Sequence, residues 1–104
     1  MTSSDLVLLS VAQINENLGK LSDWTLEDKG KMIVRNFKFK DFKEAVSFVN
    51  NVAEIAEHEN HHPDINVHSY NKVRISLSTH SSGGLTQKDF DVAKKIEDIN
   101  KDKS

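Results

Sequence analysis

The single proline of this chain, Pro63, is the residue that most constrains how it folds. Proline disfavours helical geometry at the residue before it, so a helix approaching from the N-terminal side must end before His62. Such a helix is predicted over residues 42–58, where apolar side chains recur every three or four positions. The pair His61-His62 is therefore expected to project from a helix end into a loop.

The predicted helix carries apolar side chains on two faces. One stripe follows the helical repeat and is expected to pack on the core; it consists of Phe42, Ala45, Val46, Val49, Val52, Ala53 and Ala56. Phe48 and Ile55 fall off this stripe. We expect them to meet another subunit; the alternative is that they are exposed or lie under a loop.

Alternation of apolar and polar residues predicts four strands, two before this helix and two after it. They lie around Trp24 and Leu26, over residues 32–39, around Ile65 and Val67, and over residues 73–79. Asp28-Lys29-Gly30 predicts the first hairpin turn and Tyr70-Asn71 the second. His80 comes just past the end of the last strand.

Capping signals predict two further helices. Ser10 and Gln13 have capping-box spacing before a helix over residues 10–18, and Thr86 and Asp89 have it before one over residues 87–99. The order α-β-β-α-β-β-α indicates an α+β fold, a four-stranded antiparallel sheet with three helices packed on one face. Residues 1–104 are expected to form one domain, with 1–8 and 100–104 frayed.

Composition excludes several classes of function. The net charge is -2, and the lysines are scattered among acids, which argues against nucleic acid as a partner. No apolar run has the length of a membrane span, and the N-terminus lacks the basic region of a signal peptide. Cysteine is absent, so there is no disulfide and no thiol chemistry. We predict a cytoplasmic protein.

Histidines provide the candidate chemistry. His61 and His62 at a helix end and His80 at a strand end could bracket one ligand, with Glu57 and Asp89 orienting the rings. Imidazole both gives and takes protons near neutral pH, and no serine or cysteine is placed as a nucleophile, so proton transfer is the natural reading.

Two other interpretations of the histidines remain open from the residues alone. Three histidines can bind zinc, although Pro63 interrupts the helical spacing of His58 and His62. The histidines could also be ordinary surface residues. We place His58 and His68 in that class.

Fixed spacing across this region resembles the pattern of the pterin-4a-carbinolamine dehydratases. The positions concerned are Glu57, His61-His62-Pro63, Tyr70, His80 and Asp89. The segments YNKV, LSTH and GGLT, the lone Trp24 and the F-x-F-x-D-F run at 37–42 are similar to that family too. The resemblance covers roughly residues 20 to 99.

The resemblance implies a hydro-lyase that converts 4a-hydroxytetrahydropterin to quinonoid dihydropterin and water, in the recycling of tetrahydrobiopterin for aromatic amino acid hydroxylases. It implies no metal and no cofactor. His61 and His80 would transfer protons and His62 would hold the substrate. The implied pocket residues are Asn60, Ser78, Thr79, Ser81 and Trp24, with Glu57 and Asp89 in support.

The resemblance also implies a homodimer or homotetramer, with the long helix in the tetramer contact, which would give Phe48 and Ile55 a role. Some animal members act as a dimerisation cofactor for a homeodomain transcription factor. A pterin role outside hydroxylase recycling, such as in molybdopterin metabolism, is a third possibility.

Overall fold

Four antiparallel strands form one sheet in the order β1-β2-β4-β3 in the computed structural model, which describes residues 7–103, with side chains to residue 100. The strands are β1 (Thr25–Glu27), β2 (Met32–Lys38), β3 (Asp64–His68) and β4 (Lys72–Leu77), and the helices are α1 (Val11–Leu18), α2 (Phe42–Glu59) and α3 (Gln87–Lys103). The predicted fold and element order are confirmed. No helix in this described part is long and apolar enough to cross a membrane.

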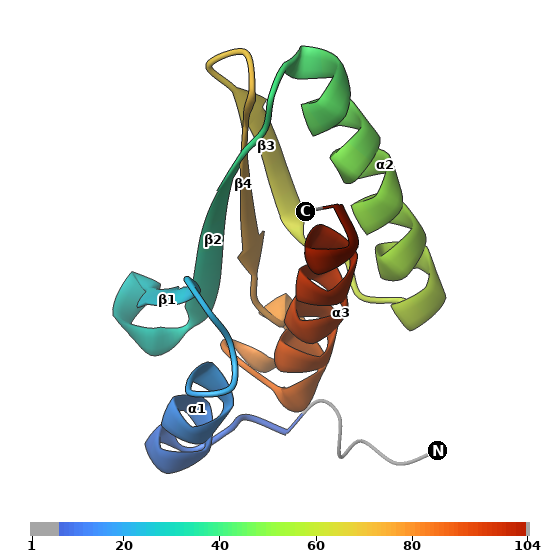
Figure 1. Cartoon of the computed structure of the whole chain (residues 1–104). Coiled ribbons are helices and arrows are strands. Elements are labelled where there is room, and N and C mark those ends of the chain that lie inside the picture. Colours follow the sequence, from blue (N-terminus) through green and yellow to red (C-terminus); the bar gives the residue numbers. More distant parts are fainter. Residues whose placement is uncertain (1–6, 104) are drawn as a thin grey trace.

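Helices α2 and α3 lie side by side against one face of the sheet, and α1 lies at the end of the sheet near β1 (Figure 1). Ile33 and Phe37 of β2 pair with Leu77 and Val73 of β4, and all four are buried in the core under the helices. Ile14 of α1 joins the same core. β3 begins at Asp64, which pairs with Ser76 near the end of β4, so the His61-His62 loop and His80 come at the same end of the sheet.

The helix ends follow the capping signals. Gln13 N–H donates to Ser10 Oγ at 3.2 Å and Ser10 N–H to Gln13 Oε1 at 2.8 Å, a complete capping box. Helix α2 ends at Glu59, one residue past the predicted end, and α3 continues to Lys103 beyond the predicted 99. Residues 100–103 therefore extend the helix, while most of the N-terminal segment expected to fray lies outside the described residues.

The expected outward position of Phe48 is wrong. Phe48 is fully buried, with its ring centroid 4.7 Å from that of Phe37 and 4.8 Å from that of Phe39. Phe42 and Val46, expected in the core, are instead 52% and 36% exposed. Both sets satisfy the helical repeat, so periodicity alone could not choose between them; the aromatic rings of β2 and the segment after it decide which face turns inward.

A polar junction ties the end of α2 to α3. Lys88 Nζ donates to the carbonyl of Glu59 at 2.9 Å, and Lys95 Nζ lies 3.8 Å from the Glu59 carboxylate. The hydrogen bond from His58, helped by Lys95 and opposed by burial, lowers the pKa of Glu59. A lowered carboxyl pKa in the folded state means that this contribution to stability is present above the ordinary glutamate pKa and is lost as pH falls through the lowered one.

Candidate active site

The turn at the end of α2 places the His61 side chain in a largely buried position. Asn60 adopts the left-handed conformation, φ 52° and ψ 43°, which ends the helix, and the N–H of His61 then donates to the carbonyl of Ala56 at 3.1 Å. The His61 side chain is only 11% exposed, and its Nε2 lies 2.6 Å from Oδ1 of Asp89. The sequence had predicted only that Asp89 supports a histidine; the structure shows that this histidine is His61.

Asp89 is fully buried, and its carboxylate meets three polar groups. Besides His61, its Oδ2 accepts a hydrogen bond from Thr79 Oγ1 at 2.8 Å and one from the backbone N–H of Thr86 at 2.9 Å. Thr86 Oγ1 lies 2.8 Å from Thr79 Oγ1. Since Thr79 gives its proton to Asp89, Thr86 is the donor in that last bond. Oδ2 of Asp89 thus accepts two hydrogen bonds, while Oδ1 faces the ring nitrogen of His61.

His62 makes a second histidine–carboxylate pair, in a more open setting. Its Nε2 lies 2.5 Å from Oε2 of Glu57, which is in the last turn of α2, and the two side chains are 56% and 76% exposed. His62 can therefore move toward a ligand more freely than His61. Within the described part of the chain, no group of three or more histidines, cysteines or carboxylates is arranged to hold a metal ion.

His80 opens the short turn η3 (His80–Ser82) directly after β4 and is exposed. Its neighbour Thr79 is buried in the Asp89 network, which brings the His80 backbone next to the His61 pair. The turn is closed by Gly83, φ 79°, and by the N–H of Thr79 donating to the carbonyl of Gly84 at 2.8 Å. Among the described residues, the imidazole of His80 makes no hydrogen bond or ion pair.

The predicted pocket residues divide into three groups. Asn60 and Ser81 are exposed beside the histidines, and Thr79 belongs to the buried network. Ser78 Oγ donates to the carbonyl of Lys31 at 2.7 Å, tying the end of β4 to the first hairpin. Trp24 lies apart from them, as described next.

The structure does not bring Trp24 to the histidines. Trp24 is 6% exposed, and its Nε1 donates to Oε2 of Glu97 at 2.8 Å, an oxygen that also accepts from Arg35 Nε at 2.6 Å. Glu97 and Asp89 are eight residues apart on α3, about 12 Å along the helix axis. Trp24 therefore fills the core and closes a buried polar cluster further along α3.

The residue that sequence reasoning missed is Thr86. Its hydroxyl completes the chain Thr86–Thr79–Asp89–His61, although it was identified only as a helix cap. His58 and His68 stand outside this chain, as predicted: their Nδ1 atoms pair locally with Glu59 and Ser69, each at 3.0 Å.

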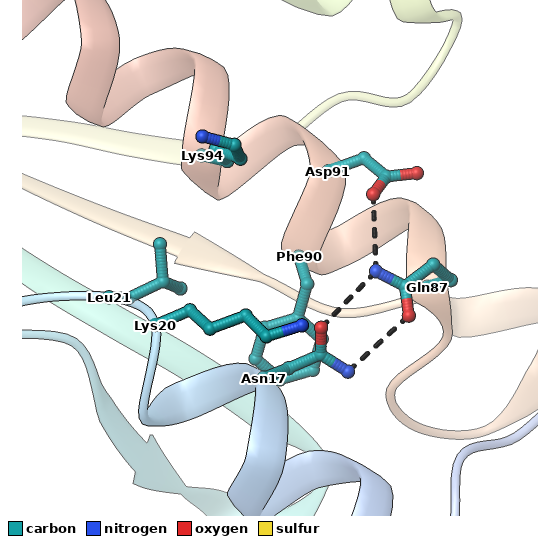
Figure 2. A pocket seen from close by; sticks show the side chains of 7 residues that line it. All are labelled: Asn17, Lys20, Leu21, Gln87, Phe90, Asp91 and Lys94. Carbon is teal, nitrogen blue, oxygen red and sulfur yellow. Dashed lines mark hydrogen bonds between the residues drawn. The ribbon is translucent and has the colours of Figure 1, made fainter.

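A cavity of about 320 Å³ lies elsewhere, between α1 and α3 (Figure 2). Figure 2 shows Asn17 and Gln87 joined by two amide hydrogen bonds of 3.3 Å, with Gln87 also donating to Asp91 at 3.1 Å. Lys20 and Lys94 also line it, and none of the predicted site residues does.

Comparison with known proteins identifies the family of this chain. Residues 7–99 match the family model described as pterin 4 alpha carbinolamine dehydratase. A "Putative pterin-4-alpha-carbinolamine dehydratase" of Trichormus variabilis is 56% identical over 93 residues, 89% of this chain and 97% of that one. A protein of the same name from Sulfurisphaera tokodaii is 47% identical over 91 residues, 88% of this chain and 95% of that one.

Two solved structures have a fold similar to that of this chain. A transcriptional coactivator/pterin dehydratase from Brucella melitensis superposes with a TM-score of 0.81 at 40% identity, covering 88% of this chain and 96% of that one. A pterin dehydratase-like protein described as a RuBisCO assembly factor in the alpha-carboxysome superposes with a TM-score of 0.62 at 22% identity, covering 74% and 88%, which shows a shared fold alone. The family model spans nearly the whole chain, and this protein belongs to the pterin 4 alpha carbinolamine dehydratase family.

Proposed function

We propose that this protein dehydrates a 4a-hydroxytetrahydropterin to the quinonoid dihydropterin by histidine acid–base catalysis, within the recycling of a tetrahydropterin cofactor in the cytoplasm. The observation that carries the mechanism is the buried Asp89 carboxylate held on Nε2 of His61 at 2.6 Å. The membership of the family supplies the substrate class.

The reaction needs two proton transfers. The 4a-hydroxyl leaves as water, so its oxygen must gain a proton, while the N5 lone pair assists the breaking of the C4a–O bond. A proton must also leave the pterin nitrogen framework. One histidine acting as acid and another acting as base supply both transfers, each worth about 10²–10⁴-fold in rate.

The hydrogen bonds favour His61 as the base. An ionised Asp89 fixes the proton of neutral His61 on Nε2, which leaves the Nδ1 lone pair to accept a proton. The same carboxylate then stabilises the imidazolium that forms. His80, exposed and next to Thr79, is the proposed acid, and His62 with Glu57 the proposed substrate-holding pair. Asn60, Ser78 and Ser81 are proposed to line the pocket.

A binding experiment tests whether this is the pterin site. Titration with a stable 7,8-dihydropterin is expected to shift the imidazole NMR signals of His61, His62 and His80 together, and to leave those of His58 and His68 unchanged. Saturable binding without any change at the first three histidines would place the pterin elsewhere and refute the proposed site.

The Asp89→Asn variant tests which ring nitrogen of His61 carries the proton. The asparagine can keep its oxygen on Thr79 and Thr86 and turn its NH₂ toward His61, which moves the ring proton from Nε2 to Nδ1. We expect kcat to fall about 10²-fold or more, since the base loses its lone pair. Nitrogen-15 NMR of His61 reads the tautomer directly; unchanged kcat with a switched tautomer would remove His61 from the base role.

We further propose that the protein forms homo-oligomers through the outer face of α2. The exposed side chains Phe42, Val46 and Ala53 and the half-buried Val49 follow a spacing of four, three and four residues along the helix. One exposed apolar residue is unremarkable, but four on one stripe form a continuous apolar seam. This stripe takes over the role first given to Phe48 and Ile55.

Phe42→Glu is expected to reduce the size of the oligomer, seen as a lower sedimentation coefficient in analytical ultracentrifugation. The reason is that burying an unpaired carboxylate in the seam is unfavourable. Leu26→Glu is the matched control, since Leu26 is 41% exposed on β1, away from α2. An unchanged sedimentation coefficient for Phe42→Glu, or an equal change for both variants, would rule out this interface.

A further inference from the structure

An apolar groove of about 300 Å³ lies between the start of α1, the turn after β1 and the loop that leads into α3. Its aliphatic side chains come from all three segments: Leu8, Leu9, Val11, Ile14, Leu26 and Leu85. We call it the Leu8–Leu85 groove. Gly83 and Gly84 line it too, three and four residues after His80, so the groove borders the loop that carries this histidine.

The groove leaves aliphatic surface open to water. Leu8 is 52% exposed, Val11 75% and Leu26 41%. Keeping adjacent apolar side chains in water is unfavourable, and a concave apolar patch of this kind marks a binding surface. Its volume matches the small end of the range for small-molecule sites, about 300–1,000 Å³.

The charged side chains that line the groove are all basic. Lys29 and Lys31 line it, no acidic residue does, and Asn15 is its only other polar side chain. Among the described residues neither lysine has an ion-pair partner. The whole chain, in contrast, carries a net charge of -2. The lining is therefore positively charged and complements an anion.

The turn that carries Lys29 is strained. Asp28, Lys29 and Gly30 all have positive φ, of 53°, 57° and 86°. Glycine adopts this conformation freely, but a lysine in it is unfavourable.

We propose that the Leu8–Leu85 groove binds a small carboxylate with an aliphatic tail. The tail lies on the leucines and Val11, and the carboxylate meets the ammonium groups of Lys29 and Lys31. The bound tail also contacts Gly84, whose carbonyl accepts the Thr79 N–H that closes the His80 turn, so binding reaches the catalytic loop. This site is separate from the proposed pterin site and does not depend on the dehydratase activity.

Octanoate is the probe, titrated into the full-length protein and followed by backbone amide NMR. We expect saturable shifts at Leu9, Gly83, Gly84 and Leu85, and none with octylamine, which has the same tail and the opposite charge. Lys29→Glu with Lys31→Glu is expected to weaken octanoate binding at least about tenfold, the size of one lost charged contact. Lys20→Glu with Lys94→Glu, the same charge change at the cavity of Figure 2, is the control and should bind normally.

Lys29→Gly separates binding from folding. It should raise the melting temperature by relieving the positive φ and still weaken octanoate binding. The proposal is overturned if octanoate gives no saturable shift, if octylamine binds equally well, or if the Lys29 and Lys31 variants bind as wild type. Shifts of the groove amides on dilution alone would show a second copy in the groove and would also overturn it.

Discussion

Replacing His61 by alanine is expected to lower kcat for pterin dehydration by about 10²–10⁴-fold, the usual contribution of one acid–base group. The reason is geometric: the His61 side chain is 11% exposed and its Nε2 is paired with a fully buried Asp89, so the fold fixes the position of its ring. The measurement is steady-state kinetics with 4a-hydroxytetrahydropterin, beside circular dichroism to show that the variant is folded.

Two further variants make this result interpretable. His80→Ala changes an exposed residue with little effect on folding, and it is expected to lower kcat comparably. His58→Ala is the control, because His58 is 83% exposed and pairs only with Glu59. Turnover that survives in both His61→Ala and His80→Ala, or that falls equally in His58→Ala, would contradict the assigned roles.

Replacing Phe48 by alanine is expected to reduce the free energy of unfolding by about 3–5 kcal/mol, as for a large aromatic side chain deleted from a core. Phe48 is fully buried and its ring contacts those of Phe37 and Phe39. For a domain whose total stability is about 5–15 kcal/mol, such a loss is large. Urea unfolding followed by circular dichroism gives the number.

Phe42→Ala is the matched control on the same helix. Phe42 is 52% exposed, so we expect a loss below about 1 kcal/mol, as for surface substitutions. The comparison is made at a concentration where both variants have the same oligomeric state, since association adds to apparent stability. Equal losses for the two phenylalanines would contradict the orientation of α2.

Local signals in the sequence were sufficient for the elements and their order. Pro63 predicted that α2 ends before His62, Ser10 and Gln13 predicted the start of α1, and alternation predicted β4; in the structure α2 ends at Glu59, where Asn60 is left-handed. These signals act over a few residues, so each can be recognised without knowing the rest of the fold. The helix faces could not be predicted in this way, because Phe48 and Phe42 both fit a helical repeat and only the aromatic rings at the end of β2 distinguish them.

The site was predictable where spacing carried information. Asp89 was expected to orient a histidine ring without the ring being specified, and in the structure its Oδ1 lies 2.6 Å from Nε2 of His61. Thr86 was not recognised as part of the network, because its hydroxyl reaches Asp89 only through Thr79, a contact between two segments that no spacing encodes. Trp24 was included on family resemblance, whereas its indole donates to Glu97 in the core.

The most direct test of the central claim is the rate at which the wild-type protein converts synthetic 4a-hydroxytetrahydropterin to quinonoid dihydropterin, measured against spontaneous dehydration in the same buffer. We expect a clear acceleration by wild type that is abolished when His61 and His80 are both replaced by alanine. No acceleration by folded wild-type protein, or full acceleration by the double variant, would contradict dehydration by this histidine pair.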